Sequence, residues 1–366
     1  MRVAHLLSGR EGGGIATVVS QLIRNFDPDL VDSRVLLLSS SPLWLKEARI
    51  PPERCRLVKK RWRGSLLVVL RIVAYCLKHD IDILHTHSIA SNFYGRLAGL
   101  CIPRMAVVTT VHARTFDELQ GAVRSRVLAR GLYSLDRWMH RFSSQIIAVS
   151  ESLREALIAE GVPAEKIATV RHGIDCGAIK VTPAEVEAAR RALRIKEGIR
   201  VIGVVGRLTR VKNHELFIQA GKQLVQKHND LVLLIVGDGP RRGELEALVR
   251  ESSLDSRTIF TGWVSRVYPV LHLLDVLVVP SLSEGFGYIL LEGMACGRPV
   301  VATRVSEIPQ IIEDGKTGLL VPPDDVQALV VAIDYLLHHP QHRKVMGEMA
   351  RREVARRFPL SQEVKG

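Results

Sequence analysis

The fold is decided by residues 283–300, which read SEGFGYILLEGMACGRPV. Just before them, residues 275–280 form a short apolar run that predicts a buried strand. A glycine-rich turn at residues 285–287 then opens residues 288–296, which are predicted as a helix. Glycines let a backbone approach a ligand closely, and free N–H groups at a helix start attract a phosphate or a sugar oxygen. The stretch therefore predicts a strand–turn–helix unit with a ligand at its turn.

The same alternation of short apolar runs and amphipathic segments continues through all 366 residues and predicts βαβ units. In the first half the expected strands are 2–8, 31–38, 83–87, 106–111, 146–149 and 168–171. In the second half they are 201–206, 231–237, 258–261, 276–280, 299–302 and 319–321. We therefore predict an α/β fold with two Rossmann-like doubly wound domains facing a central cleft.

The domain boundary is expected near residue 180, within the polar stretch of residues 176–198. This gives an N-terminal domain of residues 1–180 and a C-terminal domain of residues 181–366, whose last helix is expected to pack back on the first domain. Ligands of doubly wound domains lie at the carboxyl ends of the strands. The cleft between the two domains is therefore the expected site.

The charge is positive and uneven. Of the net +13, residues 1–175 contribute 25 Lys+Arg against 16 Asp+Glu, or +9, and the rest 26 against 22, or +4. Such a field favours anionic partners. The five cysteines are scattered without a Cys-x-x-Cys pair, which argues against a disulfide framework. The chain begins on a strand-like run, and its most apolar stretch, residues 66–77, is too short to span a bilayer, so a cytoplasmic location is expected.

Two carboxylates of the decisive stretch, Glu284 and Glu292, lie eight positions apart, so they can contact different parts of one extended ligand. The alternative makes Glu284 an N-terminal helix acid and Glu292 a surface charge. The whole string resembles the Glu-x7-Glu signature of glycosyltransferase family 4, whose members are retaining, metal-independent hexosyltransferases of the GT-B fold. The resemblance covers nearly the whole chain. It implies a C-terminal domain that binds the nucleotide sugar and an N-terminal domain on the acceptor side.

The resemblance also implies roles for single residues of this stretch. Glu284 is expected to contact hydroxyl groups of the donor sugar, and Glu292 the ribose. The backbone of Gly285, Phe286 and Gly287 is expected to hold the sugar and the diphosphate.

A second motif lies at residues 205–214, where a predicted strand ends in a basic loop. Two cations in such a loop can neutralise a diphosphate leaving group, a task that Mg²⁺ performs elsewhere. Arg207 and Lys212 match the phosphate-binding pair of the family, although Asn213 replaces its usual glycine. Val264 falls in the stretch that matches the donor-base region, and is a donor-binding candidate.

The first half adds a glycine-rich loop and a histidine. The resemblance places Gly13 and Gly14 near the donor phosphate, with a flexible turn as the alternative reading. It places His112, which follows the expected strand 106–111, beside the donor sugar, with a structural histidine as the alternative. The expected catalytic residues are therefore His112, Glu284, Arg207 and Lys212.

His85 and His87 end the expected strand 83–87 and could suggest a metal pair. Two histidines without a carboxylate or a further nearby ligand make a poor site, and the family pattern Asp-x-x-His-x-His accounts for them. We therefore predict no metal and no cofactor, because the nucleotide sugar is a substrate.

Basic residues interleaved with aromatics, around Trp62 and over residues 124–142, are typical of a surface that docks on an anionic membrane. A solvated basic face is the alternative. Many relatives use lipopolysaccharide or lipid-linked acceptors, so we expect a cytoplasmic enzyme, peripheral on the inner membrane face. Its expected substrates are a UDP-sugar donor and a glycan, lipopolysaccharide or lipid-linked acceptor.

Other functions fit less well. A sugar-nucleotide epimerase shares the architecture, but the Glu-x7-Glu string and the basic loop disfavour it. A non-catalytic basic binding protein is a second alternative; the chain has no recognised nucleic-acid motif and only 5% aromatic residues, so nucleic acid is not expected as a partner. An inactive nucleotide-sugar scaffold is disfavoured because both glutamates and both cations are intact.

Overall fold

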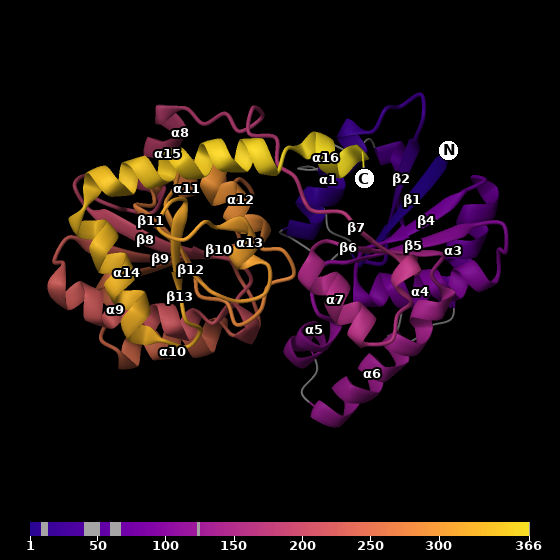
Figure 1. Ribbon diagram of the computed structural model, residues 1–366, viewed down its shortest axis with the longest axis horizontal. Coiled ribbons are helices and arrows are strands. Elements are labelled where there is room, and N and C mark those ends of the chain that lie inside the picture. Colours follow the sequence, from indigo (N-terminus) through magenta and orange to yellow (C-terminus); the bar gives the residue numbers. More distant parts are fainter. Residues whose placement is uncertain (9–13, 40–51, 59–66, 123–124, 366) are drawn as a thin grey trace. The chain divides into compact units, whose positions relative to one another are not determined.

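The computed structural model describes residues 1–8, 14–39, 52–58, 67–122 and 125–365. It divides into two compact units (Figure 1). Unit 1 comprises Met1–His172 and Glu363–Gly366, and unit 2 comprises Gly173–Gln362. The chain thus changes unit after His172 and again within its last helix.

Unit 1 is built on a parallel sheet of seven strands in the order β3-β2-β1-β4-β5-β6-β7. The strands are β1 (Arg2–Leu7), β2 (Asp32–Leu37), β3 (Cys55–Leu57), β4 (Ile83–Thr86), β5 (Ala106–Val111), β6 (Gln145–Ala148) and β7 (Ile167–Thr169). The helices are α1 (Gly14–Asn25), α3 (Leu67–Lys78), α4 (Ile89–Leu100), α5 (Thr115–Ala122), α6 (Arg126–Met139) and α7 (Glu151–Ala159). Six of these strands match the sequence prediction. The seventh, β3, was missed because it has three residues and two of them are exposed.

Helix α4 lies directly on this sheet because two glycines face it. A Cβ atom added at Gly95 would lie 2.3 Å from Cγ2 of Thr86, and one added at Gly99 would lie 2.4 Å from Cγ2 of Val107. Larger side chains would push the helix off the strands.

A buried ion pair joins α4 to α6. Nη1 of Arg96 donates to Oδ1 of Asp136 at 2.6 Å, and the Arg96 side chain is fully buried. Nδ1 of His140 and Oγ of Ser143 lie 2.9 Å and 3.1 Å from the other guanidinium nitrogens. A buried charge is tolerated when it is paired in this way.

Unit 2 is built on a parallel sheet of six strands in the order β10-β9-β8-β11-β12-β13. The strands are β8 (Arg200–Val205), β9 (Leu231–Val236), β10 (Thr258–Gly262), β11 (Val276–Val279), β12 (Val300–Thr303) and β13 (Gly318–Val321). Each matches an expected strand. The two parallel-sheet units confirm the predicted fold class.

The four central strands of unit 2, β8, β9, β11 and β12, are almost continuously buried, as in sheets that are covered on both faces. In Figure 1, α9 and α10 lie on one side of this sheet and α11 and α12 on the other. The helices are α8 (Pro183–Ala192), α9 (His214–Lys227), α10 (Arg242–Glu251), α11 (Tyr268–Leu273), α12 (Tyr288–Ala295), α13 (Ile308–Ile311), α14 (Val326–His338) and α15 (Pro340–Arg357). The last helix, α16 (Leu360–Lys365), contains the return to unit 1. Across the described residues, no helix is both long enough and apolar enough to span a bilayer.

Candidate active site

The loops after β8 and β11 meet at the centre of the unit 2 sheet. These strands are neighbours, and the chain order runs outward from them in opposite directions, to β9 and β10 on one side and to β12 and β13 on the other. Doubly wound folds bind their ligands at such a reversal point, beyond the carboxyl ends of the strands. Arg207 and Lys212 follow β8, and Glu284 follows β11. Two separate sequence motifs therefore converge here.

Glu284 is buried at this point and is held by three neighbours. Nζ of Lys212 donates to its Oε1 at 2.5 Å, and Oγ of Ser281 donates to the same oxygen at 2.7 Å. Its backbone N–H donates to Oγ of Ser306 at 3.3 Å. Charge-assisted hydrogen bonds are the stronger kind, so this carboxylate has a fixed orientation.

The two cations of the basic loop differ in their surroundings. The stem of Lys212 lies beside Gly206, where an added Cβ atom would be 3.7 Å from Cε of the lysine. Arg207 is exposed, and no carboxylate of unit 2, whose residues are all described, forms an ion pair with it. The guanidinium of Arg207 is thus accessible to an anion, whereas Lys212 already neutralises Glu284.

The predicted glycine-rich turn opens α12. Gly285, Phe286 and Gly287 are all buried, and Gly287 has a φ of 85°, a left-handed conformation that favours glycine. The ring of Phe286 packs edge-on against Phe358 at a centroid distance of 5.9 Å. This packing fixes the turn just before the first N–H groups of the helix.

Glu292 lies in the middle of α12, five residues after Gly287. Burial raises the pKa of its carboxyl group to about 7, and a hydrogen bond with Tyr268 opposes part of that rise. This carboxyl group therefore changes protonation near neutral pH. Val264 lies in the loop after β10, half-buried, next to the exposed Trp263.

Unit 1 places His112 directly after β5. Its Nε2 lies 3.4 Å from Nδ1 of His87, and its ring stacks on His172 at a centroid distance of 5.4 Å. His172 pairs through Nδ1 with Oε1 of Glu363 at 2.8 Å. Burial, with the nearby His172 and His85, holds the pKa of His112 well below its usual range, so the ring is neutral at pH 7.

The remaining predicted residues of unit 1 are the two glycines. Gly14 is the first residue of α1 and is exposed, while Gly13 lies outside the described residues. Lys212 and Glu284 meet in unit 2, and His112 belongs to unit 1.

Sequence reasoning did not find the two serines that hold Glu284. Ser281 directly follows the buried end of β11, but serine is too common in loops to stand out. Ser306 has a φ of 48°, a conformation that non-glycine residues seldom adopt. Its position depends on the loop after β12, which no local pattern relates to Glu284. The histidine His5 was also missed, because its neighbours come from a distant strand.

The structure thus has two parallel-sheet units, and in unit 2 a lysine and a glutamate pair at the reversal point where doubly wound folds bind their ligands. Two protein-family models match the chain and identify its class. The model of Glycosyltransferase Family 4 matches residues 12–177, and that of Glycosyl transferases group 1 matches residues 185–353.

Similar proteins with known names are also glycosyltransferases. The D-inositol 3-phosphate glycosyltransferase of Corynebacterium urealyticum is 33% identical over 78% of this chain and 70% of its own length. An Escherichia coli UDP-Gal:alpha-D-GlcNAc-diphosphoundecaprenol alpha-1,3-galactosyltransferase is 25% identical over 91% of this chain and 87% of its own. The crystal structure of Anabaena HepE in complex with UDP-glucose has the same fold, with a TM-score of 0.86 and 22% identity over 100% of this chain and 97% of that one. The chain belongs to glycosyltransferase family 4 and is a glycosyltransferase of the GT-B fold.

Proposed function

We propose that the protein transfers a sugar from a nucleotide-diphosphate sugar, with a UDP-sugar as the donor, to a hydroxyl group, and that it retains the anomeric configuration. The observation that carries this proposal is the pair of Lys212 and Glu284 at the reversal point between β8 and β11, beside the accessible Arg207. The UDP-glucose complex of Anabaena HepE supports the choice of donor.

In this mechanism the bond between the anomeric carbon and the diphosphate oxygen breaks, and a bond to the acceptor oxygen forms on the same face. Arg207 and Lys212 stabilise the charge that develops on the leaving diphosphate. Glu284 and the neutral His112 position the donor sugar. A leaving phosphate oxygen takes the acceptor proton, so the step needs no protein nucleophile.

The nucleotide is held by unit 2. Glu292 accepts hydrogen bonds from the ribose, and the loop of Val264 lies beside the base. The backbone of Gly285, Phe286 and Gly287 holds the sugar and the diphosphate. Gly13 and Gly14 contribute from the loop before α1. Donor binding requires no metal ion, because two cations already face the diphosphate.

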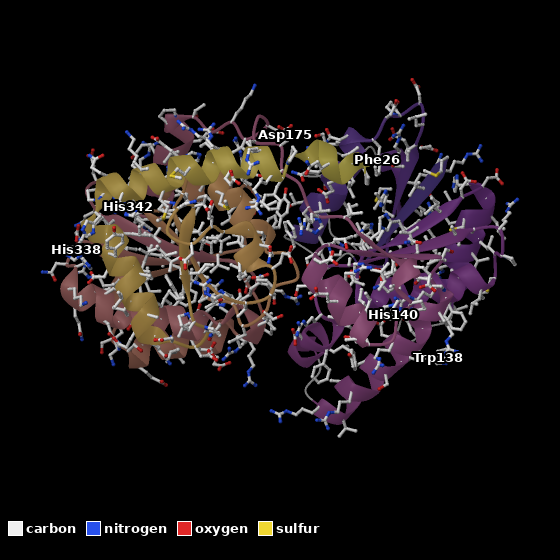
Figure 2. All side chains as sticks on the ribbon, in the orientation of Figure 1. Phe26, Trp138, His140, Asp175, His338 and His342 are labelled. Carbon is white, nitrogen blue, oxygen red and sulfur yellow. The ribbon has the colours of Figure 1, made fainter. Side chains whose placement is uncertain are left out.

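The acceptor is a glycan, a lipopolysaccharide or a lipid-linked saccharide, and unit 1 brings it in from an anionic membrane surface. The outer face of α6 supports this assignment: Val127 is 79% exposed, and Trp138, which is labelled in Figure 2, is 50% exposed. The exposed basic residues of this helix are Arg126, Arg130 and Arg137, and the exposed Arg141 follows two residues after its end. Apolar groups among cations are typical of helices that lie in a membrane interface. Trp62, in the other basic segment, lies outside the described residues.

Product analysis tests the proposal. UDP-glucose, UDP-galactose, UDP-N-acetylglucosamine and GDP-mannose are first ranked by thermal shift, and the stabilising donors are then incubated with diphosphate-linked lipid saccharides and lipopolysaccharide cores. We expect an α-linked product from an α-linked donor, identified by the proton coupling at the anomeric carbon. A β-linked product would overturn retention. Epimerised donor formed without any acceptor would identify an epimerase instead.

A further inference from the structure

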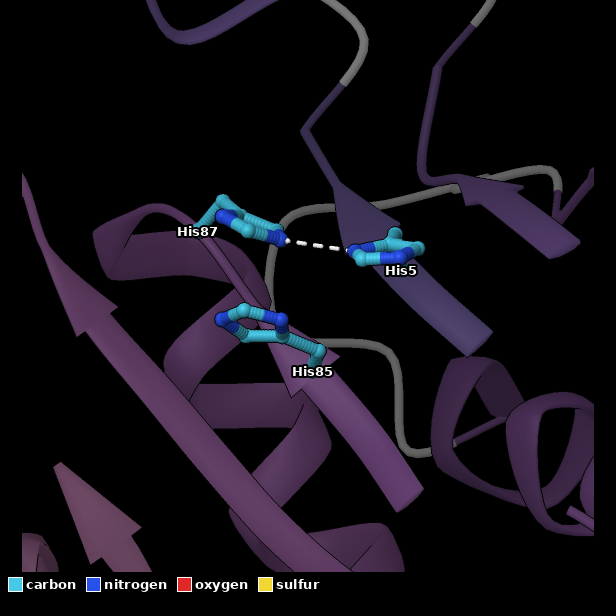
Figure 3. Close-up of side chains that lie close together, drawn as sticks. All are labelled: His5, His85 and His87. Atoms are coloured by element: carbon cyan, nitrogen blue, oxygen red, sulfur yellow. Dashed lines mark hydrogen bonds between the residues drawn. The ribbon is translucent and has the colours of Figure 1, made fainter. Parts of the chain in front are cut away.

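Three histidine side chains meet at the carboxyl ends of β1 and β4 in unit 1. His5 on β1 pairs in register with His85 on β4, and His87 lies two residues further on, so that its side chain points to the same face as that of His85. One ring nitrogen from each residue lies within 4.8 Å of the other two. Nδ1 of His5 is 3.1 Å from Nε2 of His87, as the dashed line in Figure 3 marks, and the ring of His85 faces both.

Contacts outside this cluster determine which nitrogens face inward. Nε2 of His85 is 2.7 Å from Oγ1 of Thr110, which leaves Nδ1 for the cluster. Nδ1 of His87 is 3.4 Å from Nε2 of His112, which leaves Nε2. Histidines that bind a metal usually engage their other nitrogen with a fixed partner in this way.

The outward nitrogen of His5 lacks the support that the outward nitrogens of His85 and His87 have. Nε2 of His5 is buried and has no hydrogen-bond partner within the part of the chain that the structure describes. Buried polar atoms of this kind are nearly always paired. Because His5 faces the cluster through Nδ1, a metal ion there would leave Nε2 unpaired, and the three inward-facing nitrogens alone support a site.

Burial affects all three histidines of the cluster. Burial lowers the pKa of His5 to about 4, and holds the pKa values of His85 and His87 well below their usual range. His85 is half-buried, whereas His5 and His87 are buried.

We propose that His5, His85 and His87 form a binding site for one transition-metal ion of the zinc type. Neutral imidazoles suit Zn²⁺ and its neighbours, whereas Mg²⁺ and Ca²⁺ prefer oxygen ligands. Three protein ligands leave one coordination position for water. The sequence argument against a metal pair at His85 and His87 relied on the lack of a third nearby ligand, and β1 supplies it.

A second group, His228, Asp334 and His338 of unit 2, is less suited to a metal. Oδ2 of Asp334 accepts from Nζ of Lys227 at 3.1 Å, and Nη2 of Arg200 lies 3.0 Å from Nδ1 of His228. These two cations repel a metal ion. His338, at the edge of unit 2 in Figure 2, therefore provides a matched control.

A metal ion bound by the three histidines would affect sugar transfer, an inference that rests on the proposed function. His87 links the site to His112, so a bound dication lies one imidazole ring from the residue that positions the donor sugar. A positive charge there disfavours an anomeric carbon that becomes cationic in the transition state. Zn²⁺ is therefore expected to slow sugar transfer, and a chelator is expected to restore it.

Metal titration of the full chain tests the site without any catalytic assay. Metal-free protein is titrated with Co²⁺ while its visible absorption is recorded, and Zn²⁺ affinity is measured by competition with a chromogenic chelator. The variants are His85→Ala, which removes a ligand, Thr110→Val, which removes only a supporting hydrogen bond, and His338→Ala as the control. Circular dichroism checks that each variant is folded.

We expect one equivalent of Co²⁺ to give the intense bands of four-coordinate geometry. His85→Ala should abolish them, Thr110→Val should weaken affinity about 10–100-fold, and His338→Ala should change nothing. The lack of stoichiometric binding by the unaltered chain, or equal affinity in folded His85→Ala, would overturn the site. Binding without any effect on sugar transfer would overturn only the consequence for His112, and failure to find a sugar-transfer activity would leave the site standing.

Discussion

Nζ of Lys212 lies 2.5 Å from Oε1 of Glu284, which joins the loop after β8 to the loop after β11. The glutamate side chain is almost entirely buried, and the lysine is its cationic partner. A donor diphosphate would compete with Glu284 for this ammonium group. In the proposed mechanism Lys212 responds to the charge of the leaving group while it keeps the carboxylate in place.

Replacing Lys212 with Ala should reduce kcat/KM for sugar transfer about 10²–10³-fold, because one preorganised cation at the leaving group is lost. It should also lower stability, because Glu284 becomes a buried carboxylate without its partner. Steady-state kinetics and chemical denaturation measure the two effects. Arg210→Ala, an exposed residue of the same loop, is the control. Equal losses of kcat/KM and of stability in the two variants would contradict a special role of Lys212.

Some of the residues described above could be predicted from the sequence, and others could not. Lys212 and Glu284 each belong to a contiguous motif in which a strand is followed by a loop and a helix, so the local sequence was enough to predict both residues. His5 could not be identified in this way, because only the parallel pairing of β1 with β4 places it opposite His85. Such pairing depends on tertiary contacts between distant segments, which periodicity does not reveal.

The pKa of Glu292 predicts a pH effect on donor binding. With a pKa of about 7, its carboxyl group is mostly protonated at pH 6 and mostly ionised at pH 8, where it can accept two ribose hydrogen bonds. Affinity for a UDP-sugar should therefore rise over this interval. Calorimetry should use a UDP-sugar and not UDP, because a terminal phosphate itself titrates at about pH 6. Glu292→Gln should flatten the profile, and a profile that is the same in both proteins would contradict the prediction.

Glu292 should also affect the stability of the protein without donor. Its folded pKa is raised from 4.5 to about 7, so the folded state binds more protons than the unfolded state between these values. Its contribution to stability is therefore fully present below pH 4.5 and is lost as the pH rises through 7. Glu292→Gln should accordingly stabilise the protein at pH 8 by about 1–3 kcal/mol, and have little effect at pH 4.5. Urea denaturation at the two pH values measures this difference.

Chelation should leave sugar transfer intact. In the proposed mechanism Arg207 and Lys212 supply the positive charge that a divalent ion supplies in other sites, so activity in EDTA should be no lower than that of untreated protein. Assays before and after dialysis against EDTA, with Mg²⁺ or Mn²⁺ added back, provide the measurement. Loss of activity on chelation that either ion restores would refute a metal-independent mechanism.

The buried pair of Arg96 and Asp136 should stabilise unit 1. Asp136→Ala leaves the Arg96 guanidinium buried without its carboxylate, at an expected cost of about 3–5 kcal/mol. Arg104→Ala breaks an exposed pair with Asp80 and should cost less than about 1 kcal/mol. Chemical denaturation of the two variants compares them. Similar losses would mean that burial does not control the strength of these pairs.

The outer face of α6 should attach the protein to anionic membranes through two separable contributions. Each arginine near the surface should contribute about 1 kcal/mol, with an attraction that decays over about 8 Å at physiological salt, so binding should weaken as salt rises. The guanidinium carbon of Arg141 lies 4.8 Å from the centroid of the Trp138 ring, which keeps a cation beside the exposed aromatic group. Insertion of Trp138 adds an apolar contribution that salt does not screen.

Cosedimentation with liposomes of anionic or neutral lipid, at low and high salt, separates the two contributions. Arg130→Glu should reduce binding to anionic liposomes mainly at low salt, because it reverses a charge whose effect is screened at high salt. Trp138→Ala should reduce binding at both salt concentrations, because the area that it buries in lipid does not depend on ions. Tyr335→Ala removes an aromatic residue of comparable exposure from unit 2 and should have no effect. Equal and negligible sedimentation with both kinds of liposome would exclude membrane docking, and an acceptor in solution would then be required.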